Sequence, residues 1–200
     1  MPNQAQLWFQ PLIWMDFWLA VIFTVLIPLI LLVWAFAQKT PAIQNLLIIY
    51  WRVASLLAIS VYLAIGSMPI SFLTAFAAQA LIPVSLWFWA DLNEEIEDLP
   101  SRPLKLGFST WRWATTIYST LGAIAAIPFL SCAFGTAKTD YCQAWFKPSW
   151  GYYNLFHANS NPGFLGFLGI VGLIAYSIYL VYFLTVRLGK QGRSAMAGDE

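Results

Sequence analysis

Charge is scarce in this 200-residue chain: Asp, Glu, Lys and Arg make up 10% of the residues, whereas hydrophobic residues make up 60%. Soluble domains carry about 25% charged residues, so a soluble fold could not cover this much apolar surface. Lipid solvates apolar side chains directly, and the composition therefore indicates an integral membrane protein. The net charge of +1 points to no charged partner.

Residues and motifs that mark known chemistries are also missing. The chain has one histidine, His157, and its two cysteines do not form a CxxC pair, so the spacing of a zinc site is absent. It has no phosphate-binding glycine loop, dinucleotide fingerprint, HExxH pattern or catalytic-triad signature. A basic stripe suited to nucleic acid is absent too. The sequence thus argues against nucleotide, zinc-hydrolase and nucleic-acid-binding functions.

Long apolar runs are abundant. A helix needs roughly 20 apolar residues to cross about 30 Å of hydrocarbon. Runs of that length cover residues 17–37, 46–65, 70–90, 115–134 and 164–188. Tryptophans gather near the ends of the runs, as in the aromatic belt of membrane proteins. The sequence predicts an all-α, polytopic protein with five transmembrane helices. Residues 1–200 form a single membrane domain, with an inner loop at 91–112 and an outer loop at 135–163.

The distribution of positive charge predicts the orientation. If the N-terminus lies outside, the inner side carries Lys39, Arg52, Arg102, Lys105, Arg112, Arg187, Lys190 and Arg193. The outer side then carries only Lys138 and Lys147. Cytoplasmic loops of membrane proteins are enriched in Lys and Arg, so this bias predicts an N-out, C-in topology.

The two cysteines, Cys132 and Cys142, both fall on the predicted outer side, where oxidation is permitted. A disulfide between them would close a short loop and stabilise it by about 2–3 kcal/mol. The alternative is two free thiols, one of them at the end of a span.

Arg52 stands inside the second apolar run, where a charge is expensive. Its side chain could snorkel to the membrane surface. The hairpin of the second and third runs also brings Arg52 near the inner end of the third run, where Asp91 and Glu94 follow. We therefore predict an ion pair between Arg52 and one of these carboxylates.

Two patterns concern helix packing. Prolines inside three runs each remove a backbone hydrogen bond and predict kinks: Pro28, Pro83 and Pro128. Glycines at every third position open the fifth run: Gly163, Gly166, Gly169 and Gly172. Such a ridge lets another helix approach closely, either inside the bundle or from a partner protein.

The inner loop contains one constellation with possible chemistry. If the third span continues as a helix to Leu99, four acids share a sector of about 100°: Asp91, Glu94, Glu95 and Asp98. Three cations follow at once: Arg102, Lys105 and Arg112. Clustered carboxylates with flanking cations could hold Mg²⁺ and a diphosphate. The alternative is a solvated helix end with loose surface ion pairs.

The run from Asn93 to Asp98, followed by Arg102-Pro103-Leu104 and Gly107, resembles the first acid-rich motif of the UbiA-type prenyltransferases. That family binds an isoprenoid diphosphate through Mg²⁺. The resemblance spans residues 91–107. It implies metal-side roles for Asn93, Glu94, Glu97 and Asp98, and a diphosphate-binding or loop-fixing role for Arg102. The carboxylate cluster adds Asp91 as a further candidate. The chain has no counterpart of that family's second acid-rich motif, so a relative without chemistry fits the resemblance as well.

The tryptophan-rich helices and the run Trp-Ala-Asp-Leu-Asn-Glu-Glu-Ile-Glu at 89–97 are similar to a family of uncharacterised cyanobacterial multi-pass membrane proteins. This resemblance implies a cytoplasmic or thylakoid membrane location and no particular activity.

Three functions remain. The first is a non-enzymatic accessory, assembly or stabilising component of a membrane complex, such as a photosynthetic one, with membrane lipid and that complex as partners. The second is a Mg²⁺-dependent prenyl-diphosphate-binding enzyme or a degenerate relative; only this alternative implies a cofactor. The third, a transporter, is disfavoured because the predicted spans offer few polar groups.

Overall fold

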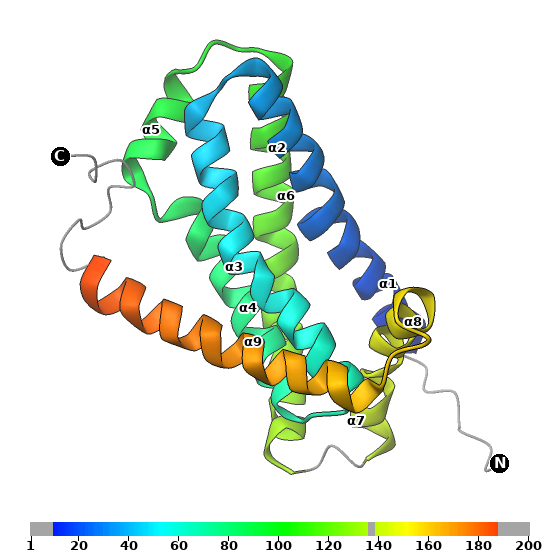
Figure 1. Cartoon of the computed structure of the whole chain (residues 1–200). Helices are drawn as coiled ribbons and strands as arrows, with labels where there is room; N and C mark the ends of the chain where they lie inside the picture. The colour runs from blue at the N-terminus through cyan, green and yellow to red at the C-terminus, as the bar shows by residue number, and fades with distance from the viewer. Residues whose placement is uncertain (1–9, 136–138, 188–200) are drawn as a thin grey trace.

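The computed structural model describes residues 10–135 and 139–187, and every regular element in these ranges is helical (Figure 1). In chain order the elements are α1 (Gln10–Ala20), η1 (Val21–Leu26), α2 (Ile27–Gln38), α3 (Pro41–Ile65), α4 (Ile70–Trp87), α5 (Ala90–Asp98), α6 (Pro103–Ala126), η2 (Ile127–Phe134), α7 (Asp140–Ala144), α8 (Lys147–Phe156), α9 (Pro162–Tyr182) and η3 (Phe183–Arg187). η1 and η3 are π-helical and η2 is 3₁₀-helical. The prediction of an all-helical protein is confirmed for the described residues.

Five helices are long and apolar enough to cross a membrane: Gln10–Gln38, Pro41–Ile65, Ile70–Trp87, Pro103–Phe134 and Pro162–Val186. The first and fourth begin well before the predicted starts at 17 and 115. An apolar run marks only the part of a helix that lies in hydrocarbon, and a tilted helix extends beyond it. As a result Asp16, Lys105 and Arg112 belong to these long helices. The end of the predicted fifth span, Leu188, lies outside the described residues.

Helices α3 and α4 form the centre of the bundle. Leu46 and Leu47 on α3 and Ile82 and Leu86 on α4 are fully buried. The buried share is largest for the span of α4, at 44%, and smallest for the span of α6 and η2, at 11%. Of the five spans, α4 is therefore the most enclosed by protein, whereas most of α6 faces outward.

The two ends of the bundle differ (Figure 1). One, which we name the α5 end, carries the turn at Lys39, helix α5 and the start of α6. The other, the α7 end, carries the α3–α4 turn, η2, α7 and α8. Residues 135–163, predicted as an outer loop, thus contain two short helices. Helix α8 packs on α1, where a Cβ on Gly151 would lie 2.6 Å from the Trp14 ring.

Pro28 follows a π-helical turn in the first span. The Ile27 N–H donates to the Ile22 carbonyl, five residues back. Where the hydrogen bonds change from π-helical back to α-helical spacing, one carbonyl is left without a donor. A second carbonyl is left without one because Pro28 has no N–H. The carbonyls of Phe23 and Thr24 therefore lack their usual donors within the helix.

Two aromatic side chains from other helices supply those donors. Trp111 Nε1 on α6 donates to the Phe23 carbonyl at 2.8 Å, and the Tyr50 hydroxyl on α3 donates to the Thr24 carbonyl at 2.8 Å. The rings of Tyr50 and Trp111 meet edge to face, with centroids 5.0 Å apart. This arrangement locks the first span to α3 and α6.

Helix α9 crosses α3 at a steep angle (Figure 1). The Gly ridge faces α3 at the crossing, so it packs inside the bundle, one of the two alternatives that the sequence left open. A Cβ on Gly166 would lie 2.9 Å from Gly66 Cα, and a Cβ on Gly169 would lie 3.0 Å from the Leu63 backbone nitrogen. A Cβ on Gly172 would lie 3.2 Å from Ile59 Cγ1. Gly163 stands apart, because its Cβ would meet only the Asn161 side chain.

Candidate functional site

The acid-rich segment is a separate helix. Helix α4 ends at Trp87, Trp89 has an extended backbone (φ −83°, ψ 102°), and α5 begins at Ala90. The expectation of a continuous helix to Leu99 is therefore wrong. At the bend the Trp89 side chain enters the core, where it is 4% exposed. The bend places α5 against α3 at the α5 end of the bundle.

One face of α5 anchors it to the core. Leu92 and Ile96 are fully buried, as expected for the apolar face of an amphipathic helix. The candidate acids lie elsewhere on the helix: Glu94, Glu97 and Asp98 are exposed, and Asp91 and Glu95 are half-buried. Within residues 10–135 and 139–187, no group of three or more His, Cys, Asp and Glu side chains could hold a metal ion.

Asn93, a metal candidate by resemblance, makes structural contacts at both ends of its amide. Its Oδ1 accepts from Arg112 Nη1 at 2.6 Å, and its Nδ2 donates to the Trp87 carbonyl at 3.3 Å. The Arg112 guanidinium also lies 4.0 Å above the centre of the Trp87 ring, a cation–π contact. Asn93 and Arg112 therefore join α5 to α4 and α6.

The other two cations of the predicted cluster lie near the start of α6. Lys105 Nζ donates to the carbonyls of Glu97 and Leu99, each at 2.6 Å, and so caps the end of α5. Arg102 is exposed and immediately precedes α6. Lys105 thus binds backbone carbonyls, whereas the Arg102 side chain is exposed.

Arg52 lies in the middle of α3. It stands about three turns, or about 16 Å, beyond Pro41, where α3 begins. A charged arginine at the centre of a spanning helix costs about 2.5–3.5 kcal/mol on insertion scales. Its Nη1 donates to the Tyr179 hydroxyl on α9 at 3.3 Å. This partner is neutral, and the ion pair with Asp91 or Glu94 stays a prediction.

A pocket of about 320 Å³ lies beside Arg52, between α3, α4 and the end of α9. We name it the wedge pocket and define it by six of its lining residues: Ile48, Arg52, Val84, Ser85, Tyr179 and Phe183. Most of the lining is apolar. The polar groups are the Arg52 guanidinium, the Asn45 amide and the hydroxyls of Ser85, Tyr176 and Tyr179.

The wedge pocket follows from a change of residue size along α9. Near the α7 end the residues of α9 that face α3 are glycines, which lets the backbones of the two helices come into contact. Further along, Tyr176, Tyr179 and Phe183 line the pocket between the same helices. The Phe183 ring packs 5.9 Å from the Trp89 ring. Large side chains hold α9 away from α3 and α4 on this side, so the helices diverge.

A second polar cluster joins α1, α4 and α6, and the sequence reasoning missed it. The Tyr118 hydroxyl donates to Asp16 Oδ1 at 3.0 Å. Nearby oxygens of Gln79, Thr115 and Ser119 are buried without a hydrogen-bond partner in the described part of the chain. The apolar run starts after Asp16, so the sequence prediction leaves this residue outside the first span. The helix-forming, aromatic-rich stretch that precedes Asp16 was the available signal.

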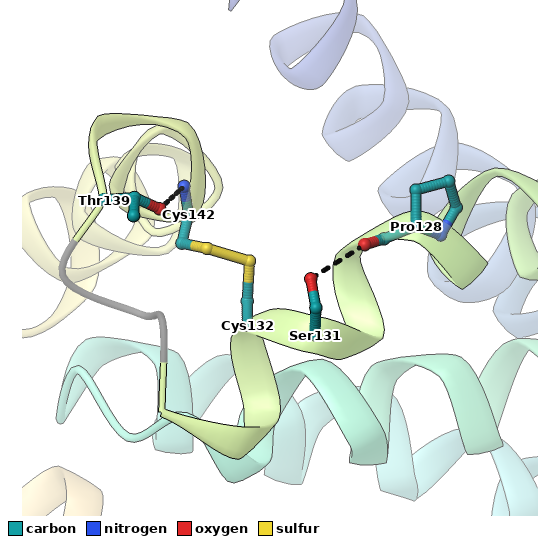
Figure 2. The surroundings of a disulfide bond; sticks show 5 residues. All are labelled: Pro128, Ser131, Cys132, Thr139 and Cys142. Atoms are coloured by element: carbon teal, nitrogen blue, oxygen red, sulfur yellow. Dashed lines mark hydrogen bonds between the residues drawn. A yellow bond between two sulfur atoms is a disulfide. The ribbon is translucent and has the colours of Figure 1, made fainter.

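A disulfide joins Cys132 to Cys142, with their Cα atoms 5.9 Å apart (Figure 2). Both residues are buried. Cys132 lies in η2, and Cys142 lies in the first turn of α7, where its N–H donates to the Thr139 hydroxyl at 3.4 Å. The bridge fastens α7 to the end of the fourth span.

The chain matches a known protein family. A family described as a protein of unknown function, DUF3177, matches residues 10–196. No curated protein and no solved structure matches the chain.

Proposed function

The chain belongs to the DUF3177 family of proteins of unknown function, and from this premise we propose that it is a non-enzymatic accessory, assembly or stabilising component of a membrane complex. The observation that carries the proposal is that the Asn93 side chain makes structural hydrogen bonds. Its amide bonds Arg112 on one side and the Trp87 carbonyl on the other. The residue that the prenyltransferase motif would turn toward a metal is engaged in holding three helices together.

The rest of α5 supports the same proposal. Leu92 and Ile96 bind the helix to the core, and Lys105 caps its last carbonyls. These contacts make α5 a brace across the end of the bundle. A helix fixed in this way suits a protein that presents a rigid surface to a larger assembly.

We also propose that the α5 end faces the cytoplasm and the α7 end the opposite side. Lys39, Arg102, Lys105 and Arg112 lie toward the α5 end, as the positive-inside tendency requires. The disulfide lies at the α7 end, which suits an oxidising compartment. The resemblance to cyanobacterial membrane proteins supports a cytoplasmic or thylakoid membrane.

The alternative is binding of a prenyl diphosphate with Mg²⁺. Its support is that Glu94, Glu97 and Asp98 are exposed on α5, and that Arg102, four residues after Asp98, is exposed too. Carboxylates of this kind bind Mg²⁺ through one or two oxygens when phosphates supply the rest.

Gentle extraction of the tagged protein from its native membrane, followed by sizing and identification of co-purifying proteins, tests the proposal. We expect a larger assembly. The double variant Glu94→Ala/Glu97→Ala should still join it, since both side chains are exposed and other residues of α5, Leu92 and Ile96, hold the helix to the core. Migration of the chain by itself would contradict the accessory role. Mg²⁺-dependent binding of a prenyl diphosphate that the double variant removes would establish the alternative.

A further inference from the structure

The wedge pocket has the composition of a binding site for an apolar molecule that carries one polar group. Its volume of about 320 Å³ falls at the lower end of ligand sites in proteins. Apolar side chains such as Ile48, Val84 and Phe183 form its walls. Arg52 and Tyr179, hydrogen-bonded to each other, place the one charged group of the lining and a hydroxyl together in the wall. A ligand would therefore bind in one orientation.

Arg52 makes that position electropositive. A guanidinium stays charged in proteins, and the Tyr179 hydroxyl that accepts its hydrogen bond is neutral. The Arg52 side chain is exposed on the side of the bundle, about three turns inside α3. Lipid surrounds a spanning helix at that depth and does not compensate a charge. An anion in the pocket would supply the missing compensation. The Tyr179 hydroxyl, which accepts from Arg52, still has its own proton to donate to such an anion.

The charge of the lining selects the kind of anion. Among the described residues that line the pocket, Arg52 is the one cation. A ligand with a single negative charge leaves the site neutral, whereas a diphosphate would leave negative charge without a partner in the middle of a spanning helix. The planar fork of a guanidinium also matches a carboxylate. The site is therefore distinct in chemistry from the acid-rich surface of α5.

We propose that the wedge pocket binds a long-chain carboxylate, a fatty acid drawn from the surrounding bilayer. The carboxylate lies on Arg52 and the Tyr179 hydroxyl, and the chain lies against the apolar walls. This inference does not depend on the accessory role, because an accessory protein and an enzyme could each hold such a lipid.

Binding of palmitate and of its methyl ester to the purified full-length protein in nanodiscs tests the proposal. The two probes differ in charge and share the chain. We expect the wild type to prefer the acid at least about tenfold, and Arg52→Gln to abolish that preference. Arg52→Lys should keep part of it, because charge remains but the fork is lost. Lys39→Gln, which removes a cation at the α5 end outside the pocket, should keep all of it.

Four results would overturn the assignment. The first is equal binding of acid and ester by the wild type, and the second is a preference for the acid that survives in Arg52→Gln. The third is unchanged binding in Ile48→Trp, because the larger side chain at this 37% exposed position should fill the pocket. The fourth is competition by phosphatidylglycerol as effective as that by palmitate, which would assign the pocket to a phosphodiester lipid. Thermal unfolding of each variant shows that a loss of binding is not a loss of fold.

Discussion

The hydroxyl of Tyr50 lies 2.8 Å from the carbonyl oxygen of Thr24, at the place where Pro28 leaves the first span without a donor. Tyr50 is fully buried and Thr24 is 3% exposed. In apolar surroundings an unpaired carbonyl is costly, and water cannot reach this one. A side chain on a different helix thus completes the backbone hydrogen bonding of the first span.

Replacing Tyr50 by Phe should lower the free energy of unfolding in detergent by about 1 kcal/mol, the usual size of a hydrogen bond between membrane helices. Denaturant titration measures the loss. Tyr182→Phe is the matched control, because that side chain is 58% exposed and should tolerate the change.

The variant Pro28→Ala provides the sharper test of this relationship. The alanine introduced there has an N–H that can donate to one of the two carbonyls that lack a donor within the helix. Tyr50→Phe should therefore lower the free energy of unfolding by less in that background. An equal cost in both backgrounds would show that the proline is not the reason for the Tyr50 hydrogen bond.

Gly166→Ala should destabilise the protein by about 1–3 kcal/mol, since the new methyl group would meet the Gly66 backbone at 2.9 Å. Gly163→Ala is the control, because its methyl group would meet only the Asn161 side chain. Thermal unfolding of both variants makes the comparison. Similar losses in the two would mean that the ridge does not set the contact of α9 with α3.

Asn93→Ala should loosen α5 by about 1.5–3 kcal/mol, the range for hydrogen bonds to charged groups. Amide hydrogen exchange should become faster in α5 and stay unchanged in the middle of α3. Glu94→Ala, an exposed change on the same helix, should leave exchange nearly as it is. Equal protection of α5 in Asn93→Ala and the wild type would remove the argument that Asn93 has a structural role.

Loss of the disulfide should destabilise the α7 end by about 2–3 kcal/mol, as expected for a bridge that closes a short loop. The double variant Cys132→Ala/Cys142→Ala measures the loss without leaving a reactive thiol. Peptide mapping of the wild type under non-reducing conditions should find the two cysteines in one linked fragment. Free thiols in protein from the native membrane would contradict the bridge.

The orientation can be read from thiol labelling. Asn159 at the α7 end and Ser101 at the α5 end are both exposed. With a membrane-impermeant reagent applied to intact cells, Asn159→Cys should be labelled and Ser101→Cys should react only after lysis. The reverse result would invert the proposed topology.

The number of spanning helices could be predicted because a membrane leaves the backbone little choice: a crossing segment pairs nearly all its backbone polar groups as a helix, so a long apolar run indicates one. The ends of the helices could not. Asp16 belongs to the first span although a carboxylate interrupts its apolar pattern, because the Tyr118 hydroxyl on α6 bonds to it. Such a partner is invisible in a local window of sequence.

The same limit applies to the candidate site. Arg52 was recognisable as unusual because an arginine inside an apolar run requires compensation. Its partner Tyr179 is separated from it by 127 positions and is one of nine tyrosines in the chain. Asn93 was singled out by a resemblance of motif, whereas its contacts with Arg112 and Trp87 depend on how α5 turns at Trp89. Tertiary packing decided both.

The wedge pocket depends on a gradient of side-chain volume along one stripe of α9, from the glycines at Gly166 and Gly169 to the aromatic rings at Tyr179 and Phe183. The small end fixes where the two helices meet, and the large end fixes how far they diverge. Pocket width is therefore a property of a few side chains and is separable from the rest of the fold. Within one family, exchange among Leu, Phe and Tyr at the large end would change the size of the molecule accommodated while the contact at Gly66 held the helices in place.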